Sequence, residues 1–309
     1  MTDTRTRLPE ARWIALAAVL LLLPAALLAY ASGGQGDDDG VDSHEVAHRD
    51  EGDALDIAAL GMEHVHGLGV NPADGQLYAA THFGVFAVAD ARGCAVVGNA
   101  QDTMGFTVAG PDWFLGSGHP DFSEDDEPLL GLIESTDAGR TWEPLSLRGE
   151  ADFHALRVAH DVTWGYDSTS GTLMSTADRQ DWQALSRLPL RDFAVSPADP
   201  DVLVATAERG PVRSSDGGRT WQPVAGAPAL VVLVWPRDDV LYGADRAGAV
   251  HLSTDGGLTW VRQGDAGGPP EAITATDAEP SEVHVAVAGR GIVSSSDGGR
   301  AFRDLHRRR

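Results

Sequence analysis

Short apolar segments separated by polar turns recur from about residue 54 to the C-terminus. Three of them have the length and composition of strands: 77–81 (LYAAT), 203–207 (LVATA) and 241–244 (LYGA). An earlier apolar segment precedes each one and ends in a turn rich in Pro and Asp, such as 67–74 (GLGVNPAD). Strands of four to eight residues bounded by turn residues predict an all-β domain.

A polar turn with the pattern S-x-D-x-G-x-x-W recurs within this region. Its members are Ser135, Asp137, Gly139 and Trp142; Ser214, Asp216, Gly218 and Trp221; Ser253, Asp255, Gly257 and Trp260; and Ser295, Asp297 and Gly299, with Phe302 in place of the tryptophan. Asp and Ser side chains form hydrogen bonds within tight turns, Gly accepts a positive φ, and Trp packs between neighbouring units. Because one active site does not need several copies, the repetition indicates a structural role.

The spacing of these turns gives the length of the repeat. Two further copies are degraded: residues 175–182 have Ala177 in the Asp position, and another copy lies near residues 88–90. The Asp positions 90, 137, 177, 216, 255 and 297 are 47, 40, 39, 39 and 42 residues apart. A period near forty with four strands per unit predicts a six-bladed β-propeller. Seven blades, the alternative, would need about 40 more residues.

The turn is the Asp-box, or BNR repeat, and its repetition resembles the sialidase-like β-propeller superfamily. The His-rich segments 63–72 (EHVHGLGVNP) and 80–84 (ATHFG) resemble a group of exported bacterial Asp-box proteins that are labelled glycosylhydrolases by similarity of fold. Photosystem II assembly-factor propellers are similar in box content and export. Both resemblances imply a binding module.

We expect Leu55–Leu60 to supply a strand that completes the last blade and closes the ring.

Three parts are predicted along the chain. Residues 1–31 contain three arginines followed by an uncharged run of 19 residues that ends in Ala-Tyr-Ala. This pattern is typical of a signal peptide. The run is also long enough for an N-terminal hydrophobic helix that anchors the chain in a membrane. Residues 32–53, rich in Gly and Asp, predict a disordered acidic linker. The propeller occupies residues 54–309. We expect it to be exported, either secreted or anchored to the outer face of the cytoplasmic membrane.

Composition excludes several classes of chemistry. The chain has 46 acidic and 23 basic residues, a formal charge of -23, which excludes an electrostatic grip on nucleic acid. All basic residues are arginine, so P-loop and Schiff-base lysine chemistry are excluded. Cys94 is the single cysteine, which excludes an intrachain disulfide and multi-cysteine metal sites. We expect a monomer that touches a membrane only through its N-terminal segment.

Several histidines interrupt the repeat at equivalent positions. Alignment of the units by their turn residues places His66, His154 and Arg191 at the start of the innermost strands. The loops after the second strands share another position, occupied by His82, His119, Glu208 and Arg246. In a propeller both positions lie on one face, at the mouth of the central channel, where rigidly supported loops commonly carry function.

We therefore predict a ligand site at the channel mouth. Its members are His64, His66, His82, His119, Asp121, His154 and Asp167. Imidazole and carboxylate groups suit a divalent transition metal such as zinc or copper, although no cofactor is fixed by the sequence. A small polar ligand, a glycan or a partner protein would also fit, and segments 102–106, 152–155 and 166–167 would line the same mouth. The alternative is that the histidines only cap strands.

A sialidase-like glycoside hydrolase is the alternative function. The resemblance implies an arginine triad, a Tyr–Glu nucleophile pair and an Asp acid. This chain has His66-Gly-Leu where that family has Arg-Ile-Pro. Tyr166, Glu208 and Arg191 remain as the catalytic candidates. The sequence favours a binding module over an enzyme.

Overall fold

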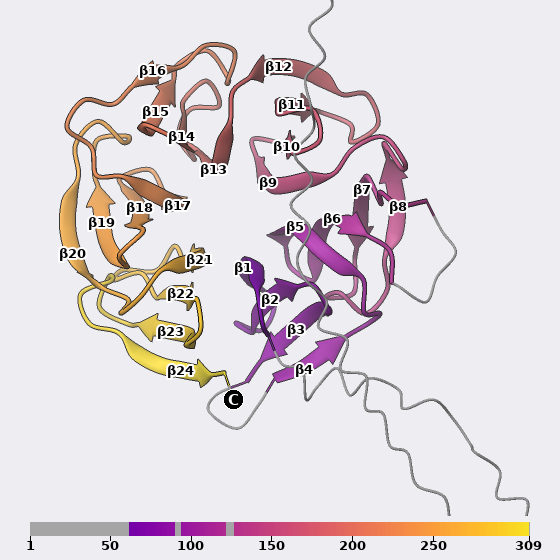
Figure 1. The fold of residues 1–309 in the computed structure, drawn as a ribbon, viewed down its shortest axis with the longest axis horizontal. Helices are drawn as coiled ribbons and strands as arrows, with labels where there is room; N and C mark the ends of the chain where they lie inside the picture. The colour runs from indigo at the N-terminus through magenta and orange to yellow at the C-terminus, as the bar shows by residue number, and fades with distance from the viewer. Residues whose placement is uncertain (1–61, 90–93, 122–126, 309) are drawn as a thin grey trace, which may run out of the picture. The chain divides into compact units, whose positions relative to one another are not determined.

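The computed structural model describes residues 62–89, 94–121 and 127–308. Within them 24 strands form six antiparallel sheets of four strands, arranged as blades around a channel (Figure 1). The prediction of a six-bladed propeller is confirmed. None of the residues described in the structure belongs to a helix able to cross a membrane. The predicted signal or anchor segment and the linker lie outside the described residues.

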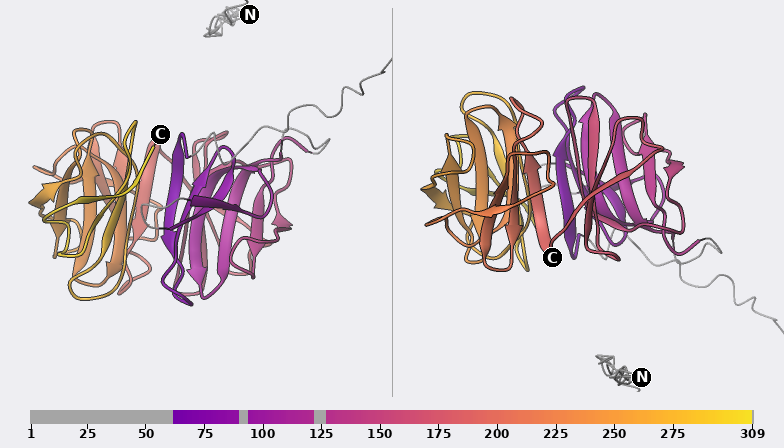
Figure 2. Two further views of the ribbon diagram at one scale, coloured as in Figure 1. Left: turned by 90° about the horizontal axis from the view of Figure 1, so that it is seen from below. Right: turned by 90° about the horizontal axis from the view of Figure 1, so that it is seen from above.

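The four strands of each blade are consecutive in the chain, and the first is innermost (Figure 1). Figure 2 shows the same ring from its side. Blade 1 consists of β1 (Val65–Val70), β2 (Leu77–Thr81), β3 (Gly84–Val88) and β4 (Cys94–Val97). Blade 2 consists of β5 (Asp102–Gly110), β6 (Trp113–His119), β7 (Leu132–Ser135) and β8 (Glu143–Ser146). Blade 3 consists of β9 (Phe153–Ala159), β10 (Val162–Asp167), β11 (Thr172–Thr176) and β12 (Gln183–Arg187).

The second half of the ring repeats this plan. Blade 4 consists of β13 (Leu190–Val195), β14 (Leu203–Ala207), β15 (Gly210–Ser214) and β16 (Gln222–Pro223). Blade 5 consists of β17 (Leu230–Arg237), β18 (Val240–Asp245), β19 (Ala249–Ser253) and β20 (Val261–Asp265). Blade 6 consists of β21 (Pro270–Ala275), β22 (Val283–Val287), β23 (Gly291–Ser295) and β24 (Arg303–Arg307). The three predicted second strands correspond to β2, β14 and β18.

Side-chain packing closes the ring between its first and last blades. Val65 and Leu68 of β1 share one buried cluster with Ala272 of β21 and Ile292 of β23. Blade 6 obtains all four of its described strands from the C-terminal part of the chain. The expectation that a strand from the other end of the chain completes the last blade is therefore corrected, and the proposed strand 55–60 lies outside the described residues.

The repeated turns are held by side-chain hydrogen bonds to the backbone. In blade 4, the Ser214 hydroxyl donates to Asp216 Oδ1 at 2.8 Å and accepts from the N–H of Gly218 at 2.9 Å. The N–H and hydroxyl of Thr220 donate to the two oxygens of Asp216. The Trp221 indole N–H donates to Ser186 of blade 3, so the turn also joins neighbouring blades. The turns that contain Asp137, Asp255 and Asp297 repeat the Ser–Asp–Gly bonds.

The turn of blade 3 is intact but shifted by one residue. The Thr176 hydroxyl donates to Asp178 Oδ1 at 3.0 Å, and the N–H groups of Gln180 and Asp181 donate to the same oxygen at 2.9 Å. Arg179 takes the positive φ of 62°. Placing Ala177 in the Asp position was wrong, because this turn is one residue shorter between its aspartate and Trp182.

Acid is expected to destabilise the propeller through these turns. Hydrogen bonds from the Thr220 hydroxyl and N–H and from the Ser214 hydroxyl lower the pKa of Asp216 to about 2, and similar bonds lower the pKa of Asp297. An unfolded aspartate has a pKa of about 3.9, so the unfolded chain binds more protons below that pH. The stabilisation is present above about pH 4 and is lost as pH falls toward about 2.

Urea unfolding midpoints measured across this pH range test the acid sensitivity. In an Asp216→Asn variant the side chain does not titrate, so its midpoint should fall less steeply with acid than that of the wild type. Identical slopes for the two proteins would show that Asp216 does not couple stability to pH.

Candidate functional site

Each innermost strand carries a β-bulge close to its first residue. In β13, for example, the pairing passes from Leu190–Ala207 to Asp192–Thr206 and leaves Arg191 unpaired. The six bulged residues are His66, Met104, His154, Arg191, Val231 and Glu271. Bulges redirect a side chain and are frequent beside functional sites. The structure thus places the aligned residues His66, His154 and Arg191 at equivalent positions in their blades.

A cavity of about 650 Å³ follows the channel between the six innermost strands. His66, His154, Arg191 and Glu271 line it near the beginnings of these strands, and His160 lines it toward their ends. The bulges therefore bring ionisable side chains from blades 1, 3, 4 and 6 to one end of the channel. We call this end the mouth.

Three side chains from blades 1 and 2 form a compact cluster at the mouth. His66 Nε2 lies 3.3 Å from His82 Nδ1, which lies 2.9 Å from Asp102 Oδ1. His66 Nε2 and Asp102 Oδ1 are 3.9 Å apart. Only 8% of the His66 side chain and 12% of the Asp102 side chain are exposed. Among the described residues, this is the one group of three ligating side chains close enough to share a metal ion.

The environment of His66 keeps its imidazole neutral. Burial, followed by the charges of His82, His64 and His154, lowers the pKa of His66 to about 3, with Asp152 opposing the shift. The ring centroids of His64 and His66 are 4.7 Å apart, and those of His66 and His82 are 4.4 Å apart. The rings of three histidines of blade 1 therefore lie together: His64 just before β1, His66 in β1 and His82 in the turn between β2 and β3.

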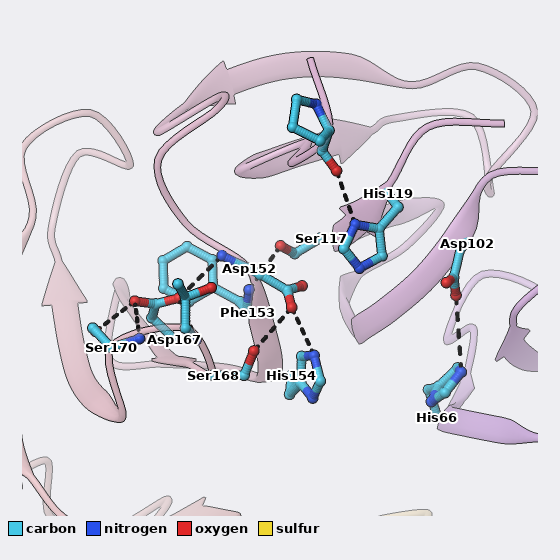
Figure 3. A network of polar contacts seen from close by, with 12 residues as sticks. His66, Asp102, Ser117, His119, Asp152, Phe153, His154, Asp167, Ser168 and Ser170 are labelled. Carbon is cyan, nitrogen blue, oxygen red and sulfur yellow. Dashed lines mark hydrogen bonds and ion pairs between the residues drawn. The ribbon is translucent and has the colours of Figure 1, made fainter. Parts of the chain in front are cut away.

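A second polar group lies at the mouth on blade 3 (Figure 3). His154 Nε2 is 2.8 Å from Asp152 Oδ2, which also accepts a hydrogen bond of 2.9 Å from the Ser168 hydroxyl. Burial acts to raise the pKa of Asp152, but the His154 hydrogen bond and charge and the Ser168 hydrogen bond lower it below the usual range. The Asp152 side chain is only 8% exposed, and its Oδ1 atom has no hydrogen-bond partner among the described residues.

The remaining predicted ligands have other surroundings. His64 is half exposed, with Nδ1 3.6 Å from Glu271 Oε1. His119 Nδ1 lies 2.8 Å from the carbonyl oxygen of Pro128. Asp167 accepts hydrogen bonds from Asp152 N and from the Ser170 N–H and hydroxyl, so it shapes the β10–β11 turn. Asp121 is partly exposed and does not belong to the three-residue cluster.

The candidates for glycoside hydrolysis are not brought together. Tyr166 is buried between blades 3 and 4, where its hydroxyl accepts a hydrogen bond from Leu190 N at 3.5 Å. Glu208 is exposed in the turn after β14, and no hydrogen bond joins these two among the described residues. Arg191 reaches from blade 4 to the carbonyl oxygen of Pro270 in blade 6.

Sequence reasoning missed one charged pair at the mouth. Glu271 is the bulged residue of blade 6 and lies within hydrogen-bonding distance of Arg308 Nη2, at 2.5 Å, and of Val65 N, at 3.2 Å. Asp102 and Asp152 lie in segments that were predicted to line the mouth, but neither was identified as a ligand. The position of Glu271 directly after the start of an innermost strand, as for His66, was the available signal.

Comparison with known proteins identifies a fold and no family. No protein-family model and no curated protein sequence matches the chain. The GH74 xyloglucanase from Xanthomonas campestris is similar in structure, with a TM-score of 0.53 and 19% identity over 79% of this chain and 38% of that one. An ancestral GH74 enzyme has a TM-score of 0.50 and 12% identity over 79% and 38% of the two chains.

A structure of the nidogen/laminin complex contains a similar chain, with a TM-score of 0.58 and 12% identity over 75% of this chain and 93% of that one. The present chain spans 38% of the length of the two GH74 structures. At such low identities the likeness shows the fold alone. The molecule is a six-bladed β-propeller with an ionisable cluster at one end of its channel, and its function must be inferred from that cluster.

Proposed function

We propose that the protein is an extracytoplasmic β-propeller module that binds a divalent transition metal, of the zinc type, at the channel mouth. The observation that carries the proposal is the convergence of His66, His82 and Asp102 from blades 1 and 2. Their nitrogen and oxygen atoms lie within 4.8 Å of one another. Imidazole nitrogen with one carboxylate oxygen is a common ligand set for zinc.

The separations within the cluster are close to those between the ligands of a bound metal ion. In a tetrahedral zinc site with Zn–N bonds of about 2.0–2.1 Å, ligand atoms lie about 3.3 Å apart. The three separations are 3.3, 2.9 and 3.9 Å. A single proton on His82 Nδ1 satisfies Asp102 when no metal is bound. A metal ion would replace that proton and be bound by all three side chains.

Titration of zinc and copper into the metal-depleted full-length chain tests the proposal. We expect one ion per chain. Loss of a residue that only supports a metal ligand typically weakens metal binding by roughly 10–100-fold. Because His66 is a direct ligand in the proposal, His66→Ala should weaken binding by more than that. His160→Asn is a matched control, because His160 lines the same cavity but hydrogen-bonds to the Ser196 carbonyl oxygen. Absence of stoichiometric binding, or equal affinity in His66→Ala, would overturn the proposal.

Membership of the Asp-box propellers is part of the proposal and is supported by the turn hydrogen bonds around Asp137, Asp216, Asp255 and Asp297.

Export is proposed from the sequence of residues 1–31. Mass spectrometry of the N-terminus of the protein recovered outside the cytoplasm tests this part of the proposal. The glycoside hydrolase alternative has less support, because Tyr166 is buried in an interblade core and Glu208 is exposed in a turn.

A further inference from the structure

The three-residue cluster leaves a metal ion with room for a further ligand. His66, His82 and Asp102 supply one atom each, whereas zinc is commonly four-coordinate. Zinc sites with three protein ligands and one water are typical of catalysis, because the metal lowers the pKa of the bound water to about 7. His66 also lines the channel cavity, so the cluster is next to a space that can admit a substrate.

The Asp152–His154 pair has the arrangement of a proton acceptor beside this cluster. An ionised carboxylate only accepts hydrogen bonds, so the 2.8 Å contact places the histidine proton on Nε2. His154 Nδ1 then carries a lone pair, and the described residues give it no hydrogen-bond partner. His154 lines the same cavity as His66. Figure 3 shows both side chains at the same mouth.

The buried Asp152 holds His154 in one orientation. Asp152 Oδ2 accepts from both His154 and the Ser168 hydroxyl, while the Asp152 backbone N–H donates to Asp167 Oδ1 at 3.1 Å. Neither the carboxylate nor its backbone can shift without breaking one of these bonds. The second carboxylate oxygen, buried and without a partner among the described residues, is available to a polar group of a bound ligand.

Resting on the proposed metal site, we propose that the mouth is a hydrolytic centre for small carboxylic esters, with His154 as the general base and Asp152 as its positioning residue. His66, His82 and Asp102 would hold the metal ion, which would supply an activated water molecule, and His154 Nδ1 would take a proton from that water. The hydroxide would attack the ester carbonyl carbon, the carbon–oxygen bond to the alcohol would break, and His154 would return the proton to the departing oxygen. Water and ester are consumed, and acid and alcohol form, without an oxidant or reductant.

The carboxyl groups at the mouth do not suit glycoside hydrolysis. Glycoside hydrolysis requires a protonated carboxylic acid beside the scissile bond. Asp152 is hydrogen-bonded as a carboxylate, Asp102 belongs to the metal cluster, and Glu271 forms an ion pair with Arg308. No carboxyl group among these three is free to act as that acid.

Hydrolysis of p-nitrophenyl acetate by the zinc-loaded full-length chain tests the inference. A general base contributes about 10²–10⁴-fold to the rate, so His154→Gln is expected to lower kcat at least about 100-fold while zinc still binds with unchanged stoichiometry. Asp152→Asn is expected to lower kcat with little change in KM, and Asp152→Glu to recover part of the loss. His160→Asn is the control and should hydrolyse the ester at the wild-type rate.

The outcomes separate the two proposals. Zinc binding without hydrolysis above that of free zinc would overturn the hydrolytic centre and leave the metal site intact. Hydrolysis that is equal in the wild type and His154→Gln would overturn the role of His154. Failure to bind zinc at all, measured by titration in the same preparations, would overturn the metal site and with it the hydrolytic centre.

Discussion

Substitution of Asp192 by alanine is expected to lower the free energy of unfolding by about 3 kcal/mol, the lower end of the range for breaking a buried ion pair. Asp192 accepts hydrogen bonds from Arg157 Nη2 at 2.5 Å, from Leu233 N at 2.7 Å and from Phe193 N at 2.8 Å. It therefore joins the innermost strands of blades 3, 4 and 5. Alanine would leave the Leu233 N–H without its partner and Arg157 with an uncompensated charge.

The ion pair, rather than the aspartate alone, determines this cost. Burial raises the pKa of Asp192, while the charge of Arg157 and the N–H groups of Leu233 and Phe193 oppose that shift. The Arg157 side chain keeps 26% of its surface exposed, so water in the channel relieves part of its lost pairing. This residual exposure is why the lower end of the range is expected.

Urea unfolding of three variants measures the contribution of Asp192. Asp192→Asn keeps a side-chain acceptor for Leu233 N but loses the charge, so its loss should be smaller than that of alanine. Asp181→Ala, at an exposed turn position, should stay within about 0.5 kcal/mol of the wild type. An Asp192→Ala protein as stable as Asp181→Ala would contradict the proposed role of the pair.

Local turn chemistry made most of the fold predictable from sequence. A turn such as that of Ser214 and Asp216 forms its hydrogen bonds within five residues, so its sequence pattern survives in each blade and marks the repeat. The blade 3 turn escaped correct alignment because Thr replaces Ser and the turn is one residue shorter, which moves its aspartate to position 178. Side-chain chemistry was preserved there while the spacing changed.

The bulge position was easiest to align from the sequence where the following turn kept its pattern. Segments such as 67–74 and 193–199 share a Pro-Ala-Asp turn, and this allowed His66 and Arg191 to be aligned. In blade 6 the connection between β21 and β22 lacks that motif, so Glu271 had no reference point in the sequence. Its equivalence to His66 depends on the three-dimensional register alone.

The identity of the carboxylate beside the histidines could not be obtained from chain order. Asp121 is two residues from His119 and was the predicted partner, whereas Asp102 lies within 2.9 Å of His82. β5, which begins at Asp102, packs directly beside β1 of the previous blade. Contacts between blades depend on how closely the innermost strands approach one another, and in this part of the ring the close approaches fall at Gly67 and Gly69 of β1 and at Gly105 of β5.

Substitution of Gly105 by alanine is therefore expected to impair both stability and the mouth. A Cβ atom at Gly105 would lie 2.2 Å from the carbonyl oxygen of Phe153 in the neighbouring blade. A backbone oxygen cannot rotate away as a side chain can, so β5 and β9 must separate. Overpacking costs about 1–3 kcal/mol, and we expect the upper end here because backbone must move.

The separation of β5 from β9 would also move His154, which directly follows Phe153, away from the cluster that contains Asp102. A displacement of about 1 Å at a catalytic group can cost on the order of 100-fold in rate. Ester hydrolysis should therefore fall more than zinc affinity in Gly105→Ala, since His66 and His82 both belong to blade 1. Gly110→Ala is the matched control in the same strand, because its Cβ would meet only the side chain of Trp113, at 3.3 Å. Equal stability and equal hydrolysis in the two variants would show that the close approach at Gly105 does not position His154.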